Sequence, residues 1–198
     1  MKHVAIVASG GANVASLQFA LERLGHESEV TADSSRIRAA SHVILPGVGA
    51  AADAMRRLRQ AGLDTLLPSL SQPVLGVCLG MQLLFDSSEE GDTRCLGIIA
   101  GRATKIPRSD ARPVPHMGWN TLAVRRPHAL LMGLDTGGYA YFVHSYALGL
   151  GAATLASTEY GPEFSACVQW RNFFGTQFHP ERSAAFGARL LENFLSLN

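Results

Sequence analysis

A single cysteine stands between two glycines in the segment LGVCLGMQLLF, residues 75–85. Gly76, Cys78 and Gly80 fit a glycine–any–nucleophile–any–glycine pattern, in which a strand turns sharply into a helix and exposes a nucleophile. The positive end of such a helix favours a thiolate over a thiol. Cysteine is also a common small buried residue. The segment alone therefore leaves Cys78 balanced between a core thiol and a nucleophile.

A nucleophilic cysteine needs a base, and His179 has the most suitable neighbours among the seven histidines. It follows an apolar run in GTQFHPERS, where Pro180 favours extended backbone and lets Glu181 project beside the imidazole. Glu181 would hold the ring in one tautomer and complete a Cys-His-Glu triad. We interpret the other histidines as structural or solvated, except His116 and His144, whose neighbours in the sequence leave a functional role open.

A site for negative charge on a reacting carbonyl oxygen is expected in the segment ILPGVGAA. Backbone N–H groups of Gly47, Val48 and Gly49 could face the sulfur together with the N–H of Leu79. Glycine-rich loops can also bind phosphate, and ASGGAN, after the first apolar run, is a second such loop. Neither ILPGVGAA nor ASGGAN fits a dinucleotide-binding or P-loop pattern. We therefore expect an oxyanion site and no cofactor.

Three apolar runs bounded by Gly or Pro occur in the first half of the chain. Their continuous hydrophobicity is typical of parallel strands covered on both faces. They span residues 3–7, 42–46 and 73–77. Helical patterns separate the runs or follow them: they cover residues 13–24, residues 50–60, the stretch after Cys78 and the final SAAFGARLLENFLSL.

The second half of the chain predicts shorter strands, with a hairpin turning at Arg171-Asn172. These strands lie near residues 97–106, 119–124, 139–147, 153–158 and 164–178. We predict an α/β fold in one domain over residues 1–198: an open sheet with a mostly parallel centre, an antiparallel extension and helices on both faces.

Composition narrows the classes of function. Lys and Arg total 17 against 16 for Asp and Glu, so no strong net field favours nucleic acid or a membrane surface. Three widely spaced cysteines without a CxxC pair argue against disulfides and a zinc site, and we expect Cys95 and Cys167 to pack in the core. The short N-terminal apolar run does not fit a signal peptide. We expect a cytoplasmic protein that holds no metal.

The elbow, the PGVG loop and the HPE segment together resemble the class I glutamine amidotransferases over almost the whole chain. LPGVGA, VPHMGWN and YFVHSYAL further resemble the branch formed by glutaminase subunits of imidazole glycerol phosphate synthases, in histidine biosynthesis. The resemblance implies a flavodoxin-like fold. It also implies that Cys78 attacks the side-chain amide of L-glutamine and forms a γ-glutamyl thioester, while His179, oriented by Glu181, moves protons to the departing ammonia and from the hydrolytic water.

The same resemblance implies further contacts. Glutamine would touch Gln82, His144, Ser145 and Tyr146. Ammonia would pass to a (β/α)₈-barrel cyclase subunit in a heterodimer, and the residues expected on the docking face are Asn13, Trp119, Asn120, Tyr141 and Arg182. The chain departs from the family in two places: the family's D-Y-G-x-G-N is replaced by residues 8–13, ASGGAN, and an aromatic residue is replaced by Ala51.

Three alternatives stay open on the sequence. The chain could serve another synthase, such as that for anthranilate or aminodeoxychorismate. It could be a cysteine hydrolase of a different elbow family, although the HPE segment is not expected there. It could also be a non-catalytic regulatory module that retains the fold.

Overall fold

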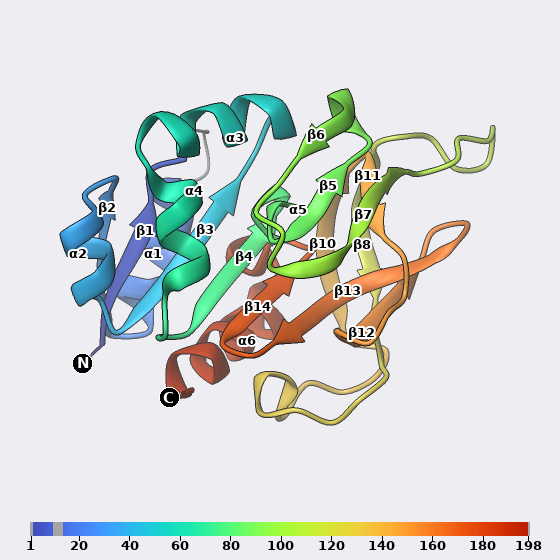
Figure 1. Cartoon of the computed structure of the whole chain (residues 1–198). Helices are drawn as coiled ribbons and strands as arrows, with labels where there is room; N and C mark the ends of the chain where they lie inside the picture. The colour runs from blue at the N-terminus through green and yellow to red at the C-terminus, as the bar shows by residue number, and fades with distance from the viewer. Residues whose placement is uncertain (1, 10–13, 198) are drawn as a thin grey trace.

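The computed structural model describes residues 2–9 and 14–197, and shows a twisted sheet flanked by helices with further strands beside it (Figure 1). The strands are β1 (His3–Val7), β2 (Glu27–Thr31), β3 (His42–Gly47), β4 (Val74–Cys78), β5 (Phe85–Ser88), β6 (Thr93–Arg94), β7 (Ile99–Lys105), β8 (His116–Thr121), β9 (Ala123–Val124), β10 (Tyr139–His144), β11 (Tyr146–Leu148), β12 (Thr154–Glu159), β13 (Glu163–Trp170) and β14 (Phe173–Thr176). The α-helices are α1 (Val14–Arg23), α2 (Ser34–Ala39), α3 (Ala51–Gln60), α4 (Leu63–Leu66), α5 (Leu79–Leu83) and α6 (Ala184–Ser196).

The main sheet of the described residues has the strand order β2-β1-β3-β4-β14-β13-β12-β9. Neighbouring strands from β2 to β14 run parallel. From β14 to β9 the pairing is antiparallel. The predicted parallel centre with an antiparallel extension is therefore confirmed, and the parallel part brings the ends of β3, β4 and β14 to one edge.

Helices cover both faces of this sheet, as predicted. Val4 and Ile6 of β1 belong to a core cluster with residues of α1 and α6, whereas Ala5 and Val7 belong to a second cluster with residues of α2 and α3. Figure 1 shows α4 in front of the sheet, α3 along the top of the view, and α1 and α6 behind the sheet. Because successive side chains of β1 point to opposite faces and both faces are buried, its sequence is apolar without alternation.

Some boundaries differ from the sequence prediction. The strand expected at 119–124 starts earlier and is divided into β8 and β9 at Leu122, and the strand expected at 139–147 is divided into β10 and β11 at Ser145. The edge strand β2 was not predicted, because much of its ESEVT sequence is solvent-facing and carries charge. The hairpin at Arg171-Asn172 is confirmed, with Arg171 at a φ of 54° between β13 and β14.

Two smaller sheets complete the architecture of the described residues. One has the order β11-β7-β5-β6, and the other pairs β10 with β8. None of the helices in the described ranges is long and apolar enough to cross a membrane.

Candidate active site

The segment around Cys78 has the sharp strand-to-helix turn that its glycines predict. Cys78 ends β4 with φ 54° and ψ −111°, and α5 begins at the next residue. A Cβ on Gly80 would lie 1.8 Å from the carbonyl oxygen of Leu45, and one on Gly76 would lie 2.6 Å from the carbonyl oxygen of Gly80. Only glycine fits at these two positions, because the backbones of β3, β4 and α5 touch there. A non-glycine residue at positive φ is strained, and such strain is typical of functional sites.

His179 and Glu181 form a hydrogen-bonded pair close to this turn. His179 Nδ1 lies 2.8 Å from Glu181 Oε1, and both side chains are almost fully buried. His179 follows β14, which runs parallel to β4, so the chain delivers both groups to the same sheet edge. The local backbone differs in one respect from the prediction: His179 is extended, but Pro180 starts a short 3₁₀ turn, Pro180–Arg182, that folds Glu181 back onto the imidazole.

The surroundings of His179 favour its charged form. Burial alone would lower its pKa, but hydrogen bonds with Cys78 and Glu181, and the charges of these two groups, raise the pKa of His179 to about 10. The imidazolium is therefore the main form at neutral pH. A positioned imidazolium can protonate a leaving amine.

A cavity of about 330 Å³ opens over the sulfur. The predicted site residues that line it are Gly47, Val48, Gly49, Cys78, Leu79, Gln82, His144, Ser145, Tyr146 and His179. Glu181 is absent from this lining and contacts His179 instead. The cavity thus brings together residues that lie up to 132 positions apart in the chain, from Gly47 to His179.

The residues expected to supply oxyanion donors come from two segments that line the cavity over the sulfur. Gly47 is the register partner of Cys78 across β3 and β4, and a Cβ there would lie 2.4 Å from the amide nitrogen of Gly80. Gly49 has a φ of 85°, which turns the chain away before α3. Leu79 is the first residue of α5, so its N–H has no carbonyl acceptor within that helix. Backbone of the segment after β3 and of the start of α5 therefore borders the same cavity.

The carbonyl oxygen of Tyr146 is a hydrogen-bond acceptor for two of the residues expected to bind the substrate. Gln82 Nε2 donates to it at 2.8 Å, and His144 Nδ1 lies 2.8 Å from it. The other ring nitrogen of His144 lies 3.1 Å from His116 Nδ1. Burial lowers the pKa of His144 to about 3 and that of His116 to about 4, so both rings are neutral at neutral pH. His144 lines the cavity, but both of its nitrogens already bond within the protein.

Three cavity residues were not predicted: Glu90, Pro115 and Val143. Glu90 Oε2 accepts the N–H of Ala51, at the start of α3, at 2.7 Å. In the sequence Glu90 is one of two adjacent acidic residues in a polar stretch, which gives no signal of a site. Gln177 was also missed. It is fully buried and donates through Nε2 to Cys78 Sγ at 3.7 Å. Its polar type inside the apolar run FFGTQF was the available signal.

Of the residues expected on a docking face, Trp119, Tyr141 and Arg182 lie together, whereas Asn120 points to the other side of β8, towards His116 and Glu159. Trp119 is 53% exposed, and its ring lies 5.9 Å from that of Tyr141, its register partner across β8 and β10. The Arg182 guanidinium lies 4.6 Å from the centre of the Tyr141 ring. Asn120 donates to the carbonyl of Glu159. Asn13 lies outside the described residues.

The two sites of departure from the family pattern have local structural roles. Ser9 is buried and its hydroxyl donates to the carbonyl of Pro46 at 2.8 Å, directly before the glycine loop. Ala51 is fully buried at the start of α3. Residues 10–13 of the first departure lie outside the described residues.

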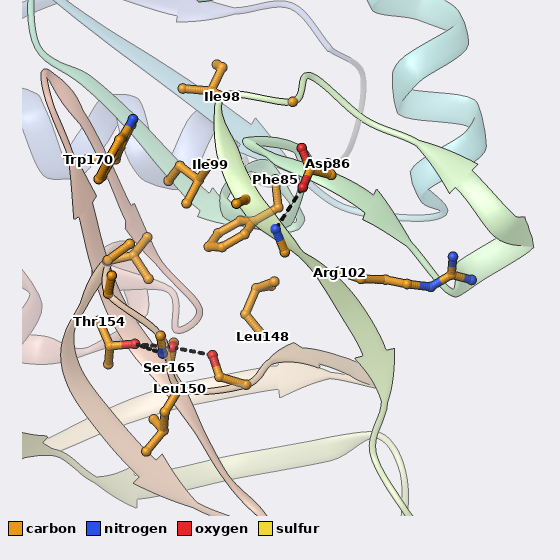
Figure 2. Close-up of a pocket in the computed structure, with 18 residues that line it drawn as sticks. Phe85, Asp86, Ile98, Ile99, Arg102, Leu148, Leu150, Thr154, Ser165 and Trp170 are labelled. Atoms are coloured by element: carbon orange, nitrogen blue, oxygen red, sulfur yellow. Dashed lines mark hydrogen bonds between the residues drawn. The ribbon is translucent and has the colours of Figure 1, made fainter.

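A larger cavity of about 660 Å³ lies between β5, β7, β12 and β13, away from Cys78 (Figure 2). Figure 2 shows Phe85, Ile99 and Leu148 among its apolar lining. Several of its polar groups already have partners: Thr154 Oγ1 lies 2.8 Å from Ser165 Oγ, and Asp86 accepts the N–H of Gly101. No cysteine or histidine is among the described residues that line it, so it offers neither a thiol nor an imidazole base.

The two other cysteines are buried thiols. Burial raises the pKa of Cys95 to about 11 and raises that of Cys167 further. Both stay protonated at neutral pH, which suits the packing role expected from the sequence.

A sequence profile described as "Glutamine amidotransferase class-I" matches residues 5–197. The chain belongs to the class I glutamine amidotransferase family. The family resemblance drawn from the elbow, the PGVG loop and the HPE segment is confirmed.

Relatives within this family carry a more specific name. "Imidazole glycerol phosphate synthase subunit HisH" of Xanthomonas oryzae pv. oryzae (strain MAFF 311018) is 50% identical over 198 residues, which cover 100% of this amidotransferase and 99% of the relative. The protein of the same name from Xylella fastidiosa (strain Temecula1 / ATCC 700964) is 48% identical with the same coverage. The resemblance to this branch is therefore also confirmed.

Solved structures agree on the fold. One described as glutamine amidotransferase superposes with a TM-score of 0.75 at 22% identity and covers 97% of this chain and 96% of its own. A structure of PurLQS from Thermotoga maritima superposes with a TM-score of 0.71 at 18% identity and covers 98% of each chain.

Proposed function

We propose that this amidotransferase, acting as a single domain, is the glutaminase subunit of an imidazole glycerol phosphate synthase. The observation that carries the proposal is the strained Cys78 beside the buried His179–Glu181 pair, at the edge of a cavity of about 330 Å³. The full-length relatives named HisH support the choice of synthase.

In the proposed reaction the Cys78 thiolate attacks the side-chain carbonyl carbon of L-glutamine. The C–N bond breaks as the His179 imidazolium donates its proton to the leaving nitrogen, so ammonia departs and a γ-glutamyl thioester remains. Neutral His179 then takes a proton from water, whose oxygen attacks the thioester. The sulfur leaves as the thiolate, so glutamate is released and the Cys78 thiolate and His179 imidazolium are restored. Amides of Leu79 and of the Gly47–Gly49 loop would stabilise the oxyanion in both halves.

The cavity wall offers polar groups for the amino-acid end of glutamine. Both hydrogens of the Gln82 amide nitrogen are used, by Tyr146 O and by Gln177 Oε1, so Gln82 would meet the substrate with its oxygen as an acceptor. Glu90 adds a carboxylate to the same wall. Both acceptors suit a substrate ammonium group, while Ser145 and Tyr146, at the junction of β10 and β11, add contacts.

The partner in this proposal is a (β/α)₈-barrel cyclase subunit that receives the ammonia. Its docking face would be the outward side of β8 and β10, where Met117 and Tyr139 are exposed beside Trp119. A cluster of exposed aromatic and aliphatic side chains of this kind is typical of a protein interface. Tyr141 joins this face to the triad, because its carbonyl accepts the His179 N–H at 3.0 Å.

Glutamine hydrolysis with and without the barrel subunit and its ligand tests the proposal. We expect little activity from the chain alone, a strong increase with the liganded partner, and none from Cys78→Ala. A glutamine-analogue diazoketone should label Cys78 in the same complex. High activity alone with no response to the cyclase would point to another synthase or hydrolase. No hydrolysis and no labelling in the complex would indicate a non-catalytic module.

A further inference from the structure

We propose that Gln177 is a further residue of the reaction, whose side-chain N–H binds Cys78 Sγ and stabilises the thiolate. The inference rests on the proposed role of Cys78 as nucleophile. The two side chains are 99 positions apart, and Gln177 Nε2 lies 3.7 Å from the sulfur. Gln177 has no solvent exposure, and its backbone N–H donates to the carbonyl of Ala166 at 2.9 Å, which holds the residue at the end of β14.

The orientation of the Gln177 amide follows from its neighbours. The carbonyl of Tyr146 can only accept, so the Gln82 atom that lies 2.8 Å from it must be the NH₂ group. That same NH₂ group lies 2.9 Å from the Gln177 amide, which must therefore present its oxygen to Gln82. The Gln177 nitrogen is left to face the sulfur. The backbone of β11 thus directs a donor, rather than an acceptor, at Cys78.

The two protonation states of Cys78 use different neighbours. The thiol can donate its S–H to the carbonyl of Val143, with the sulfur and oxygen 3.7 Å apart. The thiolate has no proton to donate, so the Val143 oxygen repels it, and the Gln177 N–H becomes its complementary neighbour together with His179. Because a hydrogen bond to the charged form favours that form, Gln177 increases the fraction of reactive sulfur.

Gln177 does not line the cavity over Cys78. Its loss should therefore act mainly on the reactivity of the sulfur: Gln82 loses one acceptor, but its hydrogen bond to Tyr146 O still fixes the direction of its amide. This separates it from Gln82, which borders the cavity as well as the hydrogen-bond chain.

The test is Gln177→Met, which removes the donor with little change in side-chain volume. The matched control is Asn193→Leu, which removes another buried amide whose nitrogen donates to two carbonyls, those of Leu130 and Met132, away from Cys78. Alkylation of Cys78 by iodoacetamide is followed against pH by peptide mass spectrometry. Glutaminase kcat and KM are measured in the complex with the partner subunit.

For Gln177→Met we expect the pH of half-maximal alkylation to rise by about one unit and kcat to fall about tenfold, since hydrogen bonds to charged groups are among the strong ones. The KM for glutamine should stay within about twofold, and Asn193→Leu should keep the unsubstituted alkylation profile. An unchanged alkylation profile in Gln177→Met overturns the inference and leaves the proposed function standing. If Cys78 of the unsubstituted protein resists alkylation at every pH, the nucleophile itself is refuted, and the inference with it.

A measurement on the unsubstituted protein covers the possibility that Gln177→Met does not fold. The side-chain amide protons of Gln177, observed by nitrogen-15 NMR, should shift across the pH range in which Cys78 becomes reactive. Side-chain signals of Asn193 should not move there. A Gln177 amide that is insensitive to this titration overturns the inference.

Discussion

At the scale of single residues, the surroundings of each histidine decide which imidazole of the site is charged. Cys78 and Glu181 raise the pKa of buried His179 to about 10, while burial lowers the pKa of His144, in the cavity wall, to about 3 and that of His116, bonded to His144, to about 4. The difference arises because His179 has an acidic partner, whereas the other two rings bond to each other and to neutral groups. One imidazole is thus selected to carry the proton.

Glu181→Gln tests this selection. The change keeps the shape and removes the negative charge, so the pKa of His179 should fall. We expect kcat in the partner complex to drop by at least about 100-fold, as when the orienting acid of a triad is neutralised. Steady-state glutaminase assays measure the loss.

The same variant changes how stability depends on pH. The folded-state pKa of His179 lies above its ordinary value of 6.5, so its contribution to the free energy of unfolding is complete below pH 6.5 and is lost as pH rises towards 10. The stability difference between the unsubstituted protein and Glu181→Gln should therefore shrink across this range in urea titrations. A difference that grows with pH would contradict the assignment.

At the scale of elements, the close contact of β3, β4 and α5 creates the elbow. Gly47, Gly76 and Gly80 each lie where a Cβ would meet backbone at less than 3 Å. Removing the side chains lets α5 begin directly at the end of β4, which presents Cys78 at the cavity. The glycines are thus required by packing, in addition to the turn itself.

Gly80→Ala should therefore destabilise the fold. Its Cβ would lie 1.8 Å from the carbonyl of Leu45, a clash with backbone that cannot be relieved by a rotamer change. We expect a loss of about 3 kcal/mol in the free energy of unfolding, measured by urea denaturation. Gly149→Ala is the matched control, because no atom lies within 4 Å of its Cβ position, and it should change stability by no more than about 0.5 kcal/mol. Equal stability of the two variants would show that the elbow tolerates a side chain.

At the scale of the whole molecule, the proposed docking face and the triad share a backbone connection. Tyr141 lies on the outward side of β10, its N–H donates to Ser183 Oγ at 2.9 Å, and its carbonyl accepts the N–H of His179. Movement of this strand on docking would be transmitted to the turn that carries His179 and Glu181. This gives a physical route by which a partner could change activity.

Trp119→Ala should weaken binding of the barrel subunit. Buried tryptophans are frequent hot spots of interfaces, so we expect the Kd to rise by about 30-fold, measured by calorimetry. Trp170→Ala is the control, since Trp170 is also exposed, by 43%, but lies in β13 outside the docking face. A Kd that changes in Trp170→Ala and not in Trp119→Ala would move the interface to another side of the molecule.

The sequence by itself determined the features that depend on local pattern. The continuous apolar runs at 3–7, 42–46 and 73–77 predicted doubly covered parallel strands, because burial on both faces removes alternation. The glycines around Cys78 predicted the elbow, and the HPE segment predicted a base with its acid, because each of these depends on neighbours only a few residues apart.

Only the tertiary structure decided which distant groups meet. Glu90 lies in a polar stretch that gives no signal of a site, and Gln177, although only two residues before His179, does not reveal from local sequence that its side chain reaches the sulfur of Cys78. The direction of the Gln177 amide depends on the carbonyl of Tyr146, on another strand and 31 positions away. Likewise, the cavity that collects Gly47, Ser145 and His179 exists only because β3, β4 and β14 end at one edge of the sheet. Contacts of this kind are set by strand order, which local sequence patterns do not encode.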